Sequence, residues 1–500
     1  MRTERFVFSL RSALALAVLA IVADSASAQP RRRPPGSGRG EFPRPTVETT
    51  TKAAEDPLKI KAVAIVGADV YTVTREIIRR GTVLMENGKI VAVGQNVAVP
   101  PGAELVDGRG KFVCPGFTAM STQNVGLRSF GTAGPTVRFA DMIDPYDRNL
   151  KWALSAGITS GVAEILTGGG GRFRRNPDDN EFQICPCCGM AVLPTEPLVP
   201  ATPQTFSLVN HVALRFAPGE LDWMILKESP FYYANAGSLT GSMNRFNWRE
   251  TIRKAKKYVA DLAQHQADLR AGKTTPPPQR PVPEDVVRLV KKEASLRIPG
   301  RTAAEIRDLA ALAKELDYLM VIDGAQEAWL AIEELAAAKA GAIYTPRNRR
   351  RSQTLREDQS GSFVETPGLF EKAGIPFAVQ ALSGSVSLDG IAGRDLMSLP
   401  LEAAFAVRGG ASERAALASL TIVPAQMLGL GDKIGSIEDG KDADVLVLSG
   451  PPLDYRTYVE RAYVLGKLAY ERGADALLPA AAAPQSAPAA APAGSSAKQN

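Results

Sequence analysis

The sequence predicts an α/β protein: a (β/α)8 TIM-like barrel joined to a small sheet domain that is built from both chain ends. Two groups of short apolar strands separated by turn residues lie at opposite ends of the chain, in residues 58–115 and 430–472. Between them, residues 116–429 alternate apolar strands with amphipathic helices, which is typical of a parallel sheet with right-handed crossovers. At this length the alternation indicates a barrel.

The first 28 residues have the features of a secretory signal. Three arginines accompany an apolar run, and Ala26-Ser27-Ala28 forms a small-x-small cleavage site. The run is shorter than the ~20 apolar residues that cross a bilayer, so a cleaved signal is favoured over an uncleaved anchor. We therefore expect an exported protein, periplasmic or secreted after cleavage near Ala28, without a membrane span.

Two further segments lack the apolar periodicity of a packed core. Residues 29–57 are rich in Arg, Pro and Gly, and residues 473–500 are mostly Ala, Pro and Ser. Such compositions predict a disordered linker and a disordered tail. The formal net charge of +6 is small for 500 residues, so the composition does not suggest a nucleic-acid partner.

The strand groups at the two ends are defined by their turns. Asn87-Gly88 separates two apolar runs and is a strong hairpin signal. A Glu438-Asp439-Gly440 turn precedes the apolar run 443–448, and two more strands follow between Tyr458 and Tyr470. Two similar strand groups at opposite ends of the chain suggest one small sheet domain built from both, with the middle region inserted.

In the middle region, strands and helices follow one another closely. A strand at 318–322 lies between helices predicted at 303–316 and 326–338, each with an apolar stripe. Another strand is expected at 377–382, and Ser412 begins a helix that runs through Leu420. These elements predict successive β/α units of the barrel.

Four cysteines are present, and three of them are clustered. Cys185, Cys187 and Cys188 could form a disulfide in an oxidising compartment or contribute to a metal site, and the sequence leaves both open. Against a zinc site, no second cysteine pair or histidine pair completes four ligands. Cys114 lies in an apolar strand and is predicted to be a buried small hydrophobic residue.

Two motifs give the chain a family resemblance. The segment Val113-Cys114-Pro115-Gly116-Phe117 and the closing segment 435–444, with its Gly-Lys-Asp-Ala-Asp, resemble the amidohydrolase superfamily, in particular exported members similar to imidazolonepropionase. The resemblance implies a barrel with a composite β-sandwich. It also implies a metal-dependent hydrolase that acts on carbon–nitrogen bonds other than peptide bonds.

The metal ligands that the resemblance implies are missing. The whole chain contains two histidines, His211 and His265. The resemblance places other residues at the ligand positions: Ser121 and Gln123 for the first histidine pair, Arg215 for a lysine, residues 298–301 and 321–324 for two more histidines, and a strand at 377–382 with no aspartate before Asp389. We therefore expect no metal and no other cofactor.

The favoured hypothesis is a metal-free, degenerate hydrolase that acts as a binding or partner protein. The degenerate ligand positions predict a polar, cationic pocket that suits a small anionic or amide ligand: Ser121, Gln123, Arg215, Arg301 and Gly324. A homo-oligomer or a pairing with a metal-bearing relative would also fit a chain that keeps the fold and loses the metal ligands.

The alternative hypothesis is an active hydrolase that uses residues other than histidine. Asp323 and Glu220 are candidates for acid–base catalysis, although pairing of such a carboxylate with an arginine such as Arg301 is the simpler interpretation. We expect His211 to be structural, because it begins the strand that ends at Arg215 and would lie roughly 13 Å from the active face. His265 is expected to face solvent from a polar helix at 260–269.

Overall fold

The computed structural model describes most of the chain after residue 60. The described residues are 61–123, 125–127, 139–165, 183–184, 191–192, 210–234, 239, 241–348, 361–386, 395–475 and 477. The predicted signal (1–28), the linker (29–57), almost all of the tail (473–500), Cys185, Cys187 and Cys188 lie outside these residues. Within them, no helix is both long and apolar enough to cross a membrane.

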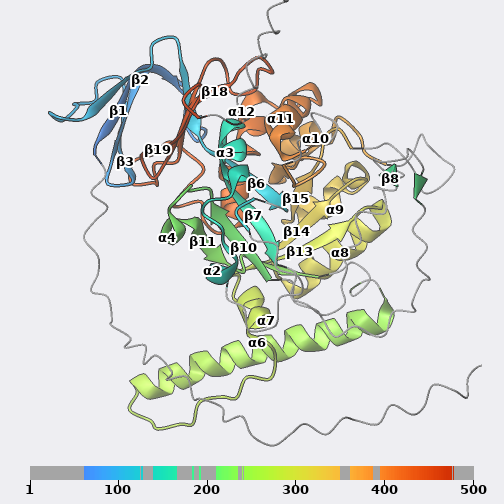
Figure 1. Cartoon of the computed structure of the whole chain (residues 1–500). Helices are drawn as coiled ribbons and strands as arrows, with labels where there is room; N and C mark the ends of the chain where they lie inside the picture. The colour runs from blue at the N-terminus through green and yellow to red at the C-terminus, as the bar shows by residue number, and fades with distance from the viewer. Residues whose placement is uncertain are drawn as a thin grey trace, which may run out of the picture. The chain divides into compact units, whose positions relative to one another are not determined.

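Strands from both chain ends pair in one eight-stranded sheet, here called the composite sheet (Figure 1). Its order is β19-β18-β17-β5-β1-β2-β3, and β4 pairs with β1. The strands are β1 (Val63–Val70), β2 (Ile78–Glu86), β3 (Lys89–Gly94), β4 (Glu104–Asp107), β5 (Phe112–Pro115), β17 (Val445–Leu448), β18 (Val459–Val464) and β19 (Lys467–Glu471). The prediction that strands from both chain ends share one sheet is therefore confirmed.

The two chain ends meet where β5 pairs antiparallel with β17. Cys114 lies opposite Leu446 in this register, and its thiol is buried, as predicted. The hairpin between β2 and β3 turns at Asn87 and Gly88, both with positive φ, which asparagine and glycine tolerate. One face of the sheet packs a cluster that draws on both ends, including Ile65, Val83, Val445 and Tyr463.

A second, four-stranded sheet has the order β11-β10-β7-β6. Its strands are β6 (Phe117–Thr122), β7 (Ile158–Ile165), β10 (Asn210–Arg215) and β11 (Ile225–Glu228). β6 and β7 are parallel, but β10 is antiparallel to both β7 and β11. The expectation of purely parallel strands in the middle of the chain is therefore wrong for β10.

A third, five-stranded sheet is parallel throughout, with the order β12-β13-β14-β15-β16. Its strands are β12 (Phe231–Tyr233), β13 (Ser295–Gly300), β14 (Met320–Gly324), β15 (Gly341–Tyr344) and β16 (Phe377–Val379). The connecting helices include α8 (Ala303–Leu316), α9 (Ile332–Ala337) and α10 (Thr366–Lys372). This region has the β/α alternation that the sequence predicted.

The four-stranded and five-stranded sheets share one apolar cluster, here called the inner cluster. Met120, Val162 and Ala213 from the first sheet are grouped with side chains of the second sheet, Phe231, Val321, Ile343 and Ala378. Ala425, from α13 (Ile422–Met427), and Leu428, Leu430 and Ile434, which follow it, complete the cluster. Residues that alternate with these along the strands, such as Ile298 and Ile322, pack in the larger core with the helices.

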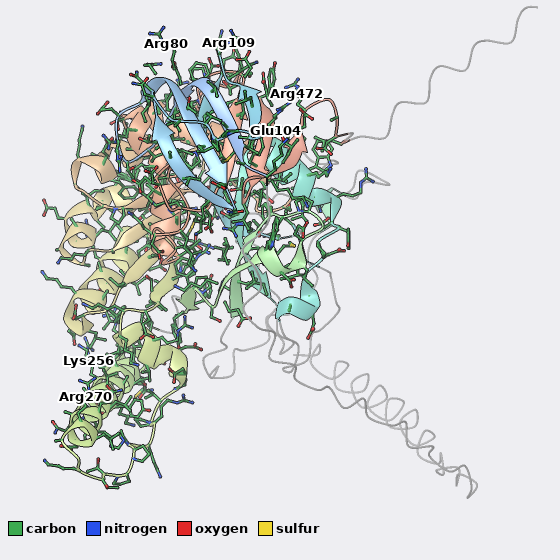
Figure 2. All side chains as sticks on the ribbon, turned by 90° about the vertical axis from the view of Figure 1, so that its left-hand side faces the viewer. Arg80, Glu104, Arg109, Lys256, Arg270 and Arg472 are labelled. Atoms are coloured by element: carbon green, nitrogen blue, oxygen red, sulfur yellow. The ribbon has the colours of Figure 1, made fainter. Side chains whose placement is uncertain are left out.

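Helix α6 (Ser242–Arg270) is much longer than the 260–269 helix that the sequence predicted, and it lies beside α7 (Glu284–Val290) (Figure 1). It is attached mainly through its first half, where Trp248, Ile252 and Ala255 are buried. Charged side chains farther along, including Lys256 and Arg270, are exposed (Figure 2). These three buried residues precede the predicted helix at 260–269, which explains why the prediction missed the first half of α6.

Candidate functional site

The carboxyl ends of β6, β13 and β14 bring several of the expected residues to one region. Ser121 is the residue before the last one of β6. Pro299 pairs in register with Asp323, and Gly300 pairs with Gly324. Parallel strands end together, and side chains at that end form the active sites of β/α folds. This end of the inner strands is therefore the candidate site.

A buried arginine, Arg297, dominates the site. It lies on β13 between Leu296 and Ile298, which both pack in the larger core, so Arg297 faces the opposite side. Its side chain is only 1% exposed. The groups that its guanidinium contacts include the carboxylate of Asp323, the main-chain carbonyl of Met120 and the ring of Phe231.

These contacts make Arg297 a link between the two inner sheets. Nε donates to Asp323 Oδ2 at 2.8 Å, and Nη2 lies 2.6 Å from the same oxygen in the ion pair. Nη1 donates to the carbonyl of Met120 on β6 at 2.7 Å. The guanidinium carbon lies 5.6 Å from the centre of the Phe231 ring, a cation–π distance. A buried charge with this set of partners is compensated and held in one orientation.

Asp323 is the acidic partner in this arrangement, and it is 17% exposed. The hydrogen bond from Nε and the ion pair with Nη2 both involve Oδ2, and Oδ1 accepts no hydrogen bond from the residues that the structure describes. The simpler interpretation, a carboxylate paired with an arginine, applies to Asp323, and the arginine is Arg297 instead of Arg301. Asp323 thus presents one free acceptor atom at the candidate site.

His211 lies at the candidate site, which corrects the expectation that it is far from the active face. Because β10 is antiparallel to β7, His211 pairs in register with Glu164, near the carboxyl end of β7. The side chain is fully buried, and the centre of its ring lies 5.3 Å from that of Tyr233. Tyr233 in turn pairs in register with Arg297. The reversed direction of a single strand therefore moves the histidine to the functional end.

The same reversal removes Arg215 from the expected pocket. Arg215 pairs in register with Ser160, near the amino end of β7. It is buried there in ion pairs with two acids of the closing segment, Asp442 and Asp444, with 3.0 Å between Nε and Asp444 Oδ2. Lys89 also pairs with Asp442. Arg215 therefore joins the inner strands to the closing segment, and the expectation that it makes the pocket cationic is wrong.

Glu220 is also placed apart from Asp323. It pairs with Lys467 of β19, and the ammonium of Lys467 lies 5.7 Å from the centre of the Trp223 ring. Glu220 precedes the short helix α4 (Leu221–Met224). The two carboxylates that the sequence suggested as an acid–base pair thus have different partners on different elements.

Ser121 and Gln123 meet the loop that follows β16. The amide of Gln123 donates to the carbonyl of Gly384 at 2.9 Å, and the Gln123 side chain is exposed. A Cβ atom on Gly384 would lie 2.8 Å from the carbonyl oxygen of Ser121 and 3.0 Å from its Oγ, so this close contact requires glycine. The two hydroxyls beside Gly384, of Ser383 and Ser385, lie 2.8 Å apart. Asp389 lies outside the described residues.

The structure also places three other residues that the sequence analysis singled out. Arg301 follows β13, where its amide donates to Glu305 at 3.2 Å. Gly324 ends β14 with φ +84°, and the space where a Cβ would lie is open. His265 is half-buried rather than solvent-facing, because its Nδ1 lies 2.7 Å from the hydroxyl of Thr275.

Known proteins resemble this chain both in sequence and in fold. The model of the amidohydrolase family matches residues 376–471. An amidohydrolase from Thermotoga maritima MSB8 is 25% identical, with a TM-score of 0.58 over 82% of this chain and 100% of that protein. The chain is therefore similar to amidohydrolase-superfamily proteins, in sequence over residues 376–471 and in fold over most of its length. Its relatives imply a TIM-barrel domain together with an additional domain.

Other superfamily structures align with the chain less closely. A putative prolidase from Bifidobacterium longum is 16% identical with a TM-score of 0.42, over 82% of this chain and 95% of that one. The dihydropyrimidinase from Brevibacillus agri NCHU1002 is 11% identical with a TM-score of 0.43, over the same shares. No curated protein sequence matches the chain at a significant level.

The side chains at the site do not fit the metal centre that the superfamily implies. Ser121 and Gln123 offer a hydroxyl and an amide, which are poor zinc ligands, and Asp323 is already paired with Arg297. Nowhere in the described ranges do three or more His, Cys, Asp or Glu side chains come together as a metal site would require. We therefore derive no chemical step through a metal.

Arg297 and Tyr233 are the site residues that sequence reasoning missed. The signal for Arg297 was available: a single arginine flanked by Leu296 and Ile298 in a short apolar strand predicts a buried charge with a partner. Tyr233 gave no comparable signal, because an aromatic residue in a short strand is usual in a core. Its position beside Arg297 depends on the register between β12 and β13.

Proposed function

We propose that this amidohydrolase-superfamily chain is a metal-free relative that binds a small amide-bearing ligand at the carboxyl ends of its inner strands. The observation that carries the proposal is the Arg297–Asp323 pair. Arg297 and Asp323 lie on strands to which the resemblance assigns metal ligands, and the carboxylate is already engaged by the arginine. The expected preference for an anion is dropped, because Arg215 is elsewhere and Arg297 is neutralised.

The electrostatic argument concerns the cost of adding a metal ion beside Arg297. Two unit charges 4 Å apart interact by about 4 kcal/mol at an effective dielectric constant of 20, and a divalent ion doubles this repulsion. Asp323 cannot offset it without leaving Arg297 unpaired, and an unpaired buried charge costs about 3–5 kcal/mol. A metal ion at this position would therefore be unstable.

The amide ligand is supported by the acceptor that Asp323 leaves available. Its Oδ1 carries charge and takes no hydrogen bond from the described residues, so it suits an N–H donor. The exposed amide of Gln123 offers both a donor and an acceptor nearby along the same strand ends. Together they match the two sides of a carboxamide group.

The finer architecture is part of the same proposal. We take the two inner sheets to be two arcs of a (β/α)8 barrel, and the composite sheet to form a small β-sandwich. The shared inner cluster and the bond from Arg297 to Met120 support the first statement, because both join strands of different sheets. The apolar cluster of the composite sheet, drawn from both chain ends, supports the second.

Metal analysis of the purified mature protein tests the proposal directly. We expect no stoichiometric transition metal by mass spectrometry, and no zinc binding by calorimetry after the protein is stripped and re-titrated. The Arg297→Met variant, in which the buried cation is removed, serves as a comparison. One tightly bound zinc per wild-type chain would contradict the proposal.

A second candidate is an active hydrolase of carbon–nitrogen bonds other than peptide bonds, and the position of His211 favours it. His211 and Tyr233 bring titratable side chains to the same strand ends as Asp323. A measured amidase or cyclic-amide hydrolase rate that is abolished by Asp323→Asn, and retained by Glu220→Gln, would support this candidate. No measurable rate on a panel of cyclic and linear amides would support the binding protein.

Export and partnership remain proposals with simple tests. Export after cleavage near Ala28 predicts that the mature protein begins at Gln29, which N-terminal sequencing of the periplasmic or secreted form would show. Pairing with a metal-bearing superfamily member, or with a second copy, predicts a complex in size-exclusion chromatography with light scattering. A lone monomer at micromolar concentration would contradict the partner role.

A further inference from the structure

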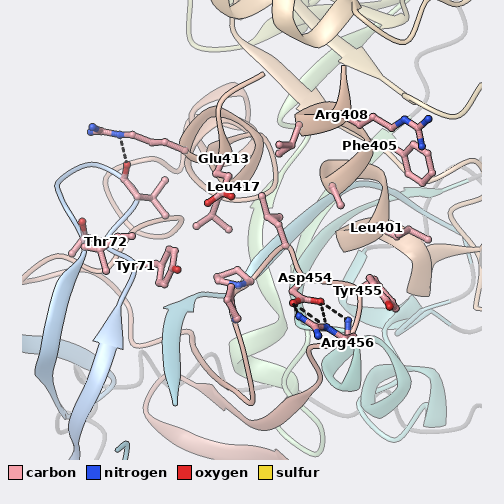
Figure 3. A pocket seen from close by; sticks show the side chains of 18 of the residues that line it. Tyr71, Thr72, Leu401, Phe405, Arg408, Glu413, Leu417, Asp454, Tyr455 and Arg456 are labelled. Atoms are coloured by element: carbon pink, nitrogen blue, oxygen red, sulfur yellow. Dashed lines mark hydrogen bonds and ion pairs between the residues drawn. The ribbon is translucent and has the colours of Figure 1, made fainter. Parts of the chain in front are cut away.

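A cavity of about 830 Å³ lies apart from the candidate site, beside helices α11 (Leu399–Arg408) and α12 (Glu413–Ala418) (Figure 3). Its other walls are the loop between β1 and β2 and the loop between β17 and β18, so the composite sheet contributes two of its sides. This volume is within the usual range for pockets that enclose small molecules. None of the residues discussed at the strand ends lines it.

The lining is mainly apolar and includes several rings. Tyr71, Phe405 and Tyr455 contribute aromatic surface, and Leu401, Leu417 and Leu453 contribute aliphatic surface. Tyr455 is 84% exposed, so this ring is available at the edge of the cavity. An apolar lining with a few charged groups is the usual composition of a site that binds a small amphipathic molecule.

One wall of the cavity is held in a strained backbone conformation. Val73 has φ +75°, a region that β-branched residues rarely adopt. Arg414 of α12 fixes this turn, because Nε donates to the carbonyl of Val73 at 3.1 Å and Nη2 donates to that of Thr74 at 2.5 Å. Strain of this kind persists where the surrounding structure maintains it, and it is concentrated at ligand sites.

The charges around the cavity are unevenly distributed. Arg456 is neutralised by Asp454, to which Nη2 donates at 2.6 Å, and the guanidinium holds the pKa of that carboxyl at about 2. Arg408, at the end of α11, makes no ion pair with any residue in the described part of the chain. Glu413 lies on the opposite side with Tyr71, whose pKa is raised by burial and to a lesser degree by Glu413. Figure 3 shows Arg408 and Phe405 at one end and Tyr71 with Glu413 at the other.

We propose that this cavity is a binding site for a small amphipathic carboxylate, with its apolar body between the aromatic side chains and its carboxylate at Arg408. A guanidinium matches a carboxylate in geometry as well as in charge. At the opposite end Glu76 and Glu413 balance the charges of Arg75 and Arg414. That end therefore has no net positive charge, and Arg408 is the favoured position for the carboxylate. This site is separate from the one at the strand ends, and it does not depend on whether that site hydrolyses or binds amides.

Calorimetric titration of the full-length mature protein with dodecanoate, kept below its micelle concentration, tests the site. We expect one molecule bound per chain, and a Kd at least about tenfold lower than that of dodecylamine, because one charge-assisted hydrogen bond corresponds to about this factor. Arg408→Glu should raise the Kd for dodecanoate by at least about tenfold. Ala404→Trp, which fills the cavity from α11, should abolish binding.

Two matched variants on α6 control for charge and for bulk. Arg270→Glu makes the same charge change at an exposed helix end, and Ala260→Trp adds the same ring to an exposed helix position. Both should bind dodecanoate as the wild type does, and circular dichroism should show that all four variants are folded. Equal binding of dodecanoate and dodecylamine, unchanged binding by folded Ala404→Trp, or no binding at all would overturn the proposal.

Discussion

Arg215 and Arg297 are both buried and both ion-paired, but they lie at opposite ends of the inner strands. Arg215 is enclosed by Asp442 and Asp444, whose side chains are 9% and 5% exposed. Arg297 is more deeply buried, yet its acid, Asp323, is 17% exposed and retains an oxygen without a hydrogen bond from the described residues. At the Arg215 end, the arginine and its two aspartates neutralise one another in the interior. At the Arg297 end, one oxygen of Asp323 is available to accept a hydrogen bond from a ligand.

The difference reflects what each arginine joins. Arg215 connects β10 to the closing segment of the chain, where Asp444 also accepts from the amide of Leu465 at 2.9 Å. Burial raises the pKa of Asp444, and Arg215 opposes that rise. Arg297 connects two inner sheets through a main-chain carbonyl. We infer that the Arg215 end maintains the fold, whereas the Arg297 end carries the function.

We expect Arg215→Met to cause the largest loss in the free energy of unfolding, which would test the difference between the two ends. The substitution leaves Asp442 and Asp444 in the interior with one cation fewer, and breaking such a buried pair costs about 3–5 kcal/mol of the free energy of unfolding. Urea unfolding followed by circular dichroism measures the loss. Arg79→Met, which breaks the exposed pair with Asp69, is the control and should cost at most about 1 kcal/mol. Similar losses in both variants would mean that the Arg215 cluster does not maintain the fold.

A smaller loss is expected from Arg297→Met, about 1–3 kcal/mol of the free energy of unfolding. Asp323 is partly exposed, so water can solvate it after the guanidinium is removed. The same unfolding measurement applies, with Arg297→Lys as a variant that keeps the charge but cannot contact both Asp323 and Met120. A loss larger than that of Arg215→Met would reverse the assignment of the two ends.

The smallest effect concerns pH and Glu438, which contacts Thr74 and Lys441 near the closed end. The hydrogen bond from Thr74 lowers the pKa of Glu438 below its ordinary value of 4.5, although burial opposes this. A lowered folded-state pKa means that the stabilisation is present above pH 4.5 and is lost as the pH falls through the folded-state value. Glu438→Gln should therefore cost up to about 1 kcal/mol at pH 7 and less at pH 3, as urea unfolding at both values would show. An equal cost at the two values would mean that the Glu438 charge contributes nothing.

Local elements were predicted well where local interactions define them. Helix α8 was predicted with its observed bounds from its apolar stripe. The structure adds a capping box between Thr302 and Glu305, which the prediction did not use. The helix predicted at 326–338 is shorter, since residues 328–330 form a 3-10 turn before α9 begins at Ile332. Ser412 caps α12 as expected, with its side chain accepting from the amide of Ala415. These outcomes depend on contacts within one or two turns.

The candidate site was predicted only in part. Ser121, Asp323 and Gly324 lie at strand ends because the order of β/α units requires it. Arg215, Glu220 and His211 were misplaced, since the direction of β10 depends on its pairing with β7 and β11 and not on its own six residues. A strand pattern has the same period in either direction, so its sequence does not show which end faces the site.

By itself, the sequence determined the resemblance to the amidohydrolase superfamily, the shared origin of the composite sheet and the shortage of histidines for the usual metal centre, because motifs, composition and turn signals require no knowledge of distant contacts. Only the tertiary structure decided which arginine enters the site. Arg297 and Asp323 are 26 residues apart, and Arg215 lies 229 residues before Asp444. Ion pairs over such separations depend on how strands align in space, and no local preference encodes that alignment.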